Sequence, residues 1–276
     1  MTRARRSTAS RLGLGAAVAA LLAFTLFPVY WMVSSALDPG AGHRGAAVLP
    51  EGLTLDHFRY VLDTGDFSRY LANSALVGLG TVLLSGLLAL FAAVAVARFQ
   101  FRMRTTVLVL ILVVQMVPLE ALVIPLFLQM RDLDMLNSLL GLTLVYLAFS
   151  LPFAVWTLRG FVAAVPREVE EAAYLDGCGW WRMFTSVLLP LVAPGLVATS
   201  IFAFIVAWNE FVLAFTFLQD DTKYTAAVGL HRFFGQYDTE WGAVMAGSTL
   251  ITLPVLVFFV LVQRRLAGGL AAGAIR

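Results

Sequence analysis

The chain has 276 residues, of which 60% are hydrophobic and 13% are charged, and its formal net charge at pH 7 is +2. A soluble domain of this length is usually nearer a quarter charged, so an ordinary folded core cannot hide this much apolar surface. The composition therefore argues against a soluble globular protein and predicts an integral membrane protein. The single cysteine, Cys178, excludes an intrachain disulfide.

Six apolar runs are long enough to cross the hydrocarbon core of a bilayer as helices, which takes roughly 20 residues each. We predict six transmembrane helices, at residues 12–35, 74–97, 105–129, 139–158, 187–217 and 243–263. The fifth run is longer than a bilayer requires, which predicts tilt or an extension beyond it. A basic start before an apolar run is also the pattern of a signal peptide, but the first run is longer than a usual signal core and fits a retained helix better.

Positive charge is distributed unevenly between the two sides of this topology. The termini and the segments after the second and fourth helices hold 13 lysines and arginines, and the remaining segments hold 6. By the positive-inside rule, the N-terminus (1–11), the C-terminal tail (264–276) and the loop 159–186 are predicted to be cytoplasmic. The loops 36–73 and 218–242 are then predicted to face outward.

The cytoplasmic loop 159–186 is the one long amphipathic segment, and it indicates two short helices joined by a turn. Pro166 suits a helix start, the helix dipole favours the glutamates that follow it, and Asp176-Gly177 is a stop signal. Ala172 and Ala173 offer a small-residue surface that another protein can approach. An interfacial helix anchored by Trp180-Trp181 is the alternative, but its acidity disfavours an anionic leaflet, so we favour a protein partner.

The stretch "EAAYLDGCGWWRMFTSVLLP" resembles the EAA loop of ATP-binding-cassette (ABC) importer permeases. The matching positions are Glu171, Ala172, Ala173, Gly177, Val187, Leu189 and Pro190. The stretches "FPVYWMVSSALDP" and "AWNEFVLAFTFL" are similar to maltose-type (carbohydrate uptake) permeases, as is the tail "GGLAAGAIR". That tail departs from the family's pattern at Ala271, Ile275 and Arg276.

This resemblance implies an all-α polytopic protein with the MetI-like permease fold, whose core would span 74–263, in the cell membrane of a prokaryote. It implies a heterodimer with a second permease, two ABC ATPase subunits that bind ATP and Mg, and an extracytoplasmic solute-binding protein that delivers a sugar. The chain itself would need no cofactor and would contact no nucleic acid. The residues implied to couple it to the ATPase are Glu171, Ala172, Ala173, Asp176, Gly177 and Pro190.

The residues themselves support a separate energy source. A P-loop needs a lysine after its glycines to reach the phosphates, and the only lysine here is Lys223 in "DDTKYT", on the predicted outer side. No nucleophile–base pair or metal-ligand spacing appears around His43, His57 or His231, so no catalytic or metal residue is predicted.

Polar residues within spans are the candidates for the solute pathway, because such groups are costly in lipid. They are Trp208, Asn209 and Glu210 in the fifth span and Gln115 in the third, with Glu120 as a weaker candidate. These residues offer the aromatic face and polar groups that a sugar needs. Asn209 and Glu210 could instead cap a kink or join adjacent helices, which is the interpretation that we favour, and Asn73-Ser74 is explained by an N-cap at the start of the second span.

Two alternatives remain open. The same architecture could carry another small polar solute, such as a polyamine or a glycerol-phosphate ester. A stand-alone ion-coupled carrier is the other, but it would need no EAA loop and more often shows inverted repeats.

Overall fold

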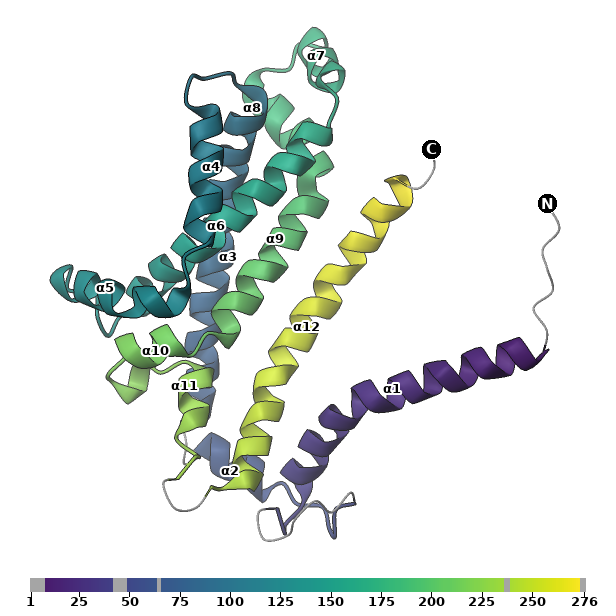
Figure 1. The fold of residues 1–276 in the computed structure, drawn as a ribbon, viewed down its shortest axis with the longest axis vertical. Helices are drawn as coiled ribbons and strands as arrows, with labels where there is room; N and C mark the ends of the chain where they lie inside the picture. Colours follow the sequence, from purple (N-terminus) through teal and green to yellow (C-terminus); the bar gives the residue numbers. More distant parts are fainter. Residues whose placement is uncertain (1–7, 42–48, 64–65, 236–238, 274–276) are drawn as a thin grey trace. The chain divides into compact units, whose positions relative to one another are not determined.

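The computed structural model describes residues 8–41, 49–63, 66–235 and 239–273, and these residues are almost entirely helical (Figure 1). Within them, the only β feature is an isolated bridge between Phe234 and Thr239. The helices are α1 Thr8–Leu37, α2 Asp56–Asp63, α3 Phe67–Arg98, α4 Arg104–Gln115, α5 Leu119–Asp132, α6 Leu139–Ala164, α7 Arg167–Leu175, α8 Trp180–Met183, α9 Leu189–Asn209, α10 Val212–Phe217, α11 Ala226–His231 and α12 Trp241–Gly273.

Five stretches of helix are long and apolar enough to cross a membrane: Gly13–Leu37, Phe67–Arg98, Leu139–Ala164, Trp180–Asn209 and Trp241–Leu261. The pair α4 and α5 makes a sixth span if it is counted as one. Helices are expected here because a bilayer offers no water to backbone N–H and C=O groups, which must therefore pair within the segment. These stretches confirm the all-helical membrane architecture predicted from composition.

The third predicted span, 105–129, is not one helix. α4 and α5 meet at an angle of 100° across a break at residues 116–118. Pro118 causes the break, because it disfavours helical geometry at the residue before it and its own backbone is extended. The amide of Met116 closes a tight turn on the carbonyl of Val113, at 3.0 Å, which ends α4.

The second predicted span begins earlier than expected, so the interpretation of Asn73-Ser74 as an N-cap is wrong. α3 begins at Phe67 because the rings of Phe67 and Tyr70 are buried and hold the first turns in place. The Asn73 amide instead donates to the carbonyls of Thr222 and Tyr224, at 3.0 and 2.9 Å. These bonds fasten the loop before α11 to the side of α3.

The chain divides into two compact units. The smaller unit consists of residues 1–67 and 230–252. In it, Gly242 of α12 lies directly against the imidazole of His57 in α2, and the Tyr60 hydroxyl donates to Glu240 at 3.3 Å. The pKa of the Tyr60 hydroxyl is raised, mainly by burial and to a smaller extent by that hydrogen bond.

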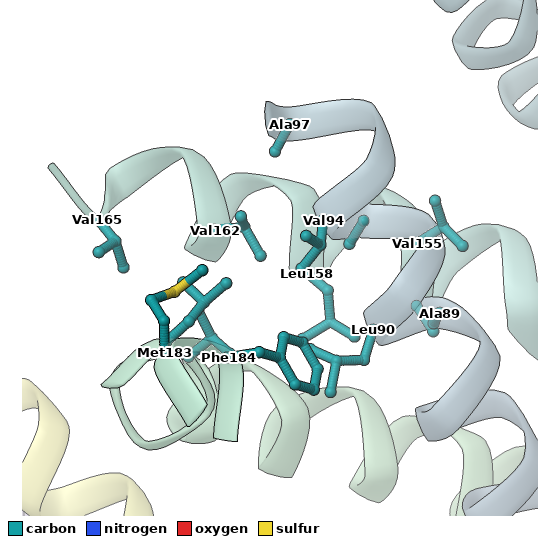
Figure 2. Close-up of a cluster of buried hydrophobic side chains, with 14 of the residues drawn as sticks. Ala89, Leu90, Val94, Ala97, Val155, Leu158, Val162, Val165, Met183 and Phe184 are labelled. Atoms are coloured by element: carbon teal, nitrogen blue, oxygen red, sulfur yellow. The ribbon is translucent and has the colours of Figure 1, made fainter. Parts of the chain in front are cut away.

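The larger unit consists of residues 68–229 and 253–276, and its core lies where α3, α6 and the start of α9 meet. Figure 2 shows Leu90, Val94, Leu158 and Phe184 interdigitating there. α6 and α9 pack closely because Gly195 of α9 has no side chain where Phe161 of α6 approaches. A methyl carbon on Gly195 would lie 2.5 Å from that ring.

We expect Gly195→Ala to destabilise the larger unit, because the added methyl forces the Phe161 ring or the α9 backbone to shift. Overpacking of this kind costs about 1–3 kcal/mol. The measurement is thermal unfolding in detergent. The matched control is Gly160→Ala in α6, which meets no atom within 4 Å and should be neutral or slightly stabilising because alanine favours helix. Equal unfolding temperatures for the two variants would contradict the packing.

Candidate functional site

The segment between α6 and α9 folds as two short helices joined by a turn. Pro166 is the extended N-cap of α7, with φ −60° and ψ 139°. The helix ends at Asp176, and Gly177 follows with φ +83°, a conformation that side chains with a Cβ rarely adopt. The Cys178 amide then bonds back to the Ala173 carbonyl at 3.0 Å. The sequence-predicted helix–turn–helix is therefore present, with the turn at its predicted glycine.

The Glu-Ala-Ala triplet at 171–173 is divided between two faces of α7. Ala173 is buried at 7% exposure and belongs to the core formed by α3, α6 and the start of α9. Glu171 and Ala172 are exposed, and Leu175 at the end of the helix is 89% exposed. Tyr174 beside it is also exposed, and two adjacent exposed apolar side chains next to exposed carboxylates make a surface that another protein can bury. Ala173 does not belong to that surface, contrary to the expectation that both alanines do.

A charged group that was not predicted from the sequence holds α7 in place. Glu170, one residue before the triplet, accepts a hydrogen bond from Arg98 Nε at 2.7 Å. Both side chains are nearly buried, at 12% and 11% exposure. Arg98 Nη2 also donates to the Val165 carbonyl at 2.8 Å, and Arg167 Nη2 donates to the Arg98 carbonyl at 3.2 Å. We call Arg98, Val165, Arg167 and Glu170 the arginine junction.

A cavity of about 270 Å³ lies beside this junction. Its lining includes Arg98, Glu170 and Glu171, together with the aromatic rings of Trp180 and Phe184. Trp180 and Phe184 stack with their centroids 5.3 Å apart. The face of α7 that lies against the rest of the protein is therefore only partly packed. Ala173 and the arginine junction are the contacts that hold it.

α8 continues directly into α9 through a π-helical segment, Phe184–Leu188. Pro190, one of the predicted motif positions, lies in the first turn of α9. Proline has no N–H to donate to the carbonyl four residues earlier, and a locally widened turn accommodates that loss. The turn after α7 is thus joined to a helical rod that runs from Trp180 to Asn209.

At its other end this rod stops at Glu210, so the predicted span 187–217 is divided. The Glu210 carboxylate accepts hydrogen bonds from the amides of Leu213 and Ala214, at 2.9 and 3.1 Å, which begin α10. It also accepts from the Tyr146 hydroxyl of α6 at 2.6 Å. Glu210 therefore joins α9, α10 and α6, which agrees with the alternative prediction that this residue caps a kink or joins adjacent helices.

The other pathway candidates differ in their exposure. Trp208 is 2% exposed and stacks on Phe204 with their centroids 5.1 Å apart, so it offers no free ring face to a solute. Asn209 is exposed, although its amide donates to the Ile205 carbonyl at 2.9 Å. Gln115, at the end of α4, lines a second cavity of about 260 Å³. The rings of Phe149, Phe153 and Phe202 line the same cavity.

The loop after α10 is tied down by side chains. The side-chain oxygen of Asn137 accepts hydrogen bonds from the backbone amides of Gln219 and Asp220. The Lys223 ammonium group donates to the backbone carbonyl of Asn137 at 2.7 Å. Hydrogen bonds from the Thr222 side chain and backbone lower the pKa of Asp220. In the part of the chain that the structure describes, no three His, Cys, Asp or Glu side chains converge to hold a metal.

The family described as "binding-protein-dependent transport system inner membrane component" matches residues 85–271. The diacetylchitobiose uptake system permease protein of Streptomyces coelicolor is 40% identical over 91% of this chain and 92% of its own length. The trehalose transport system permease protein of Mycobacterium tuberculosis is 35% identical over 93% and 94%. The trehalose/maltose transport system permease protein of Thermococcus litoralis is 33% identical over 91% of each.

A solved structure has the same fold. It is a bacterial ABC transporter involved in the import of the acidic polysaccharide alginate, with a TM-score of 0.79. The match covers 94% of this chain and 98% of that chain, at 22% sequence identity.

We expect Glu210→Gln and Tyr146→Phe each to lower thermal stability in detergent by about 1–3 kcal/mol, since each removes hydrogen bonds to a charged group. The control is Glu120→Gln, because Glu120 is exposed in the first turn of α5. This substitution removes only the favourable interaction of its charge with the helix dipole. If Glu210→Gln were no less stable than the control, the joint would not depend on this carboxylate.

Proposed function

Because the chain belongs to the family of binding-protein-dependent transport system inner membrane components, we propose that it carries a sugar or oligosaccharide across the cell membrane. The family consists of ABC importer permease subunits, which are transport proteins and not enzymes. The sugar is supported by relatives that match most of both chains and are named for diacetylchitobiose, trehalose and maltose uptake.

The proposal includes partners. A solute-binding protein delivers the sugar on the outer side, a second permease completes the pathway, and two ATPase subunits bind ATP and Mg. The excess of arginine at the α7 end supports a cytoplasmic location for α7 and for both termini. By its resemblance to the family, the C-terminal tail 264–276 is proposed to reach towards the ATPases, and its last residues, 274–276, lie outside the described residues.

The observation that carries this function is the exposed, acidic face of α7, held on a rigid core. Glu171, Ala172 and Leu175 are exposed, while Ala173 and Glu170 anchor the same helix from beneath. A helix that receives force from an ATPase needs an accessible face and a firm attachment, and α7 has both. We propose that Glu171, Ala172, Asp176 and Gly177 form the ATPase contact, that Ala173 seats it, and that Pro190 marks where the rod of α8 and α9 begins.

For the solute we propose the cavity that Gln115 lines. Its three phenylalanine rings supply apolar faces for a sugar ring, and the Gln115 amide can both donate to and accept from hydroxyl groups. The adjoining break at 116–118 fits this assignment, since irregular backbone at membrane depth is tolerated where it lines a water-filled space. Asn209 remains a second candidate, whereas Glu210 and Trp208 are proposed to shape the pathway from behind.

Gln115→Ala should raise the solute concentration needed for half-maximal uptake, because an amide that bonds hydroxyl groups is lost. Its thermal stability should stay that of the wild type, since Gln115 is exposed. Uptake by proteoliposomes that contain the whole complex measures the first, and unfolding in detergent measures the second. An unchanged half-maximal concentration would remove Gln115 from the pathway.

Gly177→Val should leave the permease in the membrane but uncouple ATP hydrolysis from uptake, since a β-branched residue resists the positive φ that orients the end of α7. Glu171→Lys should uncouple the two by reversing charge on the exposed face. Gly177→Asn is the mild counterpart, because asparagine tolerates this conformation. Gly179→Val is the control, since Gly179 has φ −72° and open space around it. Normal uptake in both Gly177→Val and Glu171→Lys would sink the assignment.

The experiment that tests the function as a whole is a pull-down of the tagged chain, co-expressed with its neighbouring genes. The captured solute-binding protein is then screened against sugars. We expect a second permease, an ATPase and a sugar-selective binding protein. A binding protein indifferent to sugars would discard the carbohydrate substrate and keep the importer, and recovery without an ATPase would contradict the role of α7.

A further inference from the structure

We infer that the Arg98–Glu170 ion pair is the link through which movement of α7 reaches α3. The inference rests on the proposed function, in which α7 receives the movement of the ATPase. It assigns a positioning role to two residues outside the Glu-Ala-Ala triplet, and it adds α3 to the helices that α7 moves.

Three helix ends meet at this pair. Arg98 is the last residue of α3, Val165 is the C-cap of α6, and Glu170 lies in the first turn of α7. One guanidinium bonds both other ends, through Nε to Glu170 and through Nη2 to the Val165 carbonyl. Arg167 returns a bond from α7 to the Arg98 carbonyl, so α7 and α3 are joined in both directions.

Apolar packing provides only part of this connection. The cavity beside the junction leaves part of α7, around Arg167, Glu171 and Tyr174, unpacked against α3. Ala173 reaches the shared core with only a methyl group. In contrast, the chain itself joins α7 to α6 through residues 165–166 and to α8 through the turn at 176–179. The path to α3 runs instead through side chains, namely the Ala173 methyl group and the hydrogen bonds of the arginine junction.

The chemistry of the pair suits fixed geometry more than stability. A nearly buried ion pair gains little over apolar residues of similar size, because both charges lose their hydration. What it adds is direction, since a planar guanidinium that bonds two acceptors holds them at a set distance and angle. A pull on α7 is therefore resisted at Arg98 before the neighbouring apolar contacts are strained.

The test measures the coupling ratio, which is the number of solute molecules taken up per ATP hydrolysed by the complete complex in proteoliposomes. Glu170→Gln keeps the shape of the side chain and removes its charge. We expect it to retain the ATPase subunits and lower the ratio about fivefold or more, the lower end of the range for coupling between two sites. Glu168→Gln, in the same turn and exposed, should keep the wild-type ratio.

A covalent tether separates a link from a charge effect. Arg98→Cys with Glu170→Cys, in a Cys178→Ser background, leaves two thiols that a short neutral thiol-reactive cross-linker can join. The ratio should be low before cross-linking and should recover afterwards, although no charge has been restored. Cys178→Ser alone should behave as the wild type. A merely structural pair would change the yield of the complex and leave the ratio of the assembled fraction unaltered.

The outcomes are distinct. A wild-type ratio in assembled Glu170→Gln overturns the inference, as does a ratio that the tether leaves low. If Glu170→Gln fails to assemble, Arg98→Lys is measured instead, because lysine keeps the positive charge but cannot make both hydrogen bonds. A wild-type coupling ratio in Arg98→Lys overturns the inference. Loss of assembly in every variant overturns it as well. Failure of the proposed function differs, since the wild-type complex would then show no ATP-driven uptake, or Glu171→Lys would transport normally.

Discussion

A backbone amide or carbonyl within hydrocarbon has no water to bond, and the arrangement of this chain depends on that constraint. Long helices meet it without help, so the difficult places are the points where a helix ends or breaks. At the break after α9 one carboxylate, that of Glu210, accepts from two amides that begin α10. At the junction of α3, α6 and α7, arginine side chains donate to the carbonyls of Arg98 and Val165. A charged side chain therefore serves the break after α9 and the junction of α3, α6 and α7, whereas the break at 116–118 is made by Pro118 without a side-chain cap.

The short helix α7 resolves two opposing requirements. A surface that binds a partner must be exposed, and nine residues in isolation are too few to form a stable helix in water. The structure meets both by placing buried and exposed residues next to each other, so that Glu170 and Ala173 are buried and Glu171 and Ala172 are exposed. The charges at 168 and 170 also lie in the first turn, where the helix dipole favours them. Anchoring supplies the order that the intrinsic helix propensity of so short a segment does not.

Composition and run length were enough to predict the membrane helices, and the Asp176-Gly177 stop signal was enough to predict the turn, because both depend on local properties. The break at 116–118 was not predicted, since Pro152, Pro194 and Pro254 leave their helices continuous and proline alone does not show where a helix stops. The division at 210–211 was an open alternative, because Asn209 and Glu210 could cap a kink. The start of α3 was misplaced because Phe67 and Tyr70 are held by packing. Glu170 was passed over for Glu171, since neighbouring glutamates look alike until one of them meets Arg98. An arginine directly after an apolar run was the available signal.

The two candidate regions are connected by one continuous element. The helical rod Trp180–Asn209 has 30 residues, a length of about 45 Å at 1.5 Å per residue, which exceeds the thickness of the hydrocarbon core. One end follows the turn after α7 and contains the π-helical segment, and the other stops at the Glu210 joint. Between these ends the rod packs closely against α6, where Gly195 meets the Phe161 ring. In the proposed mechanism, a displacement at α7 is passed along this rod to the joint where Glu210 holds α9, α10 and Tyr146 together. Because hydrogen bonds to a single carboxylate make that joint, it can be rearranged without opening the apolar core.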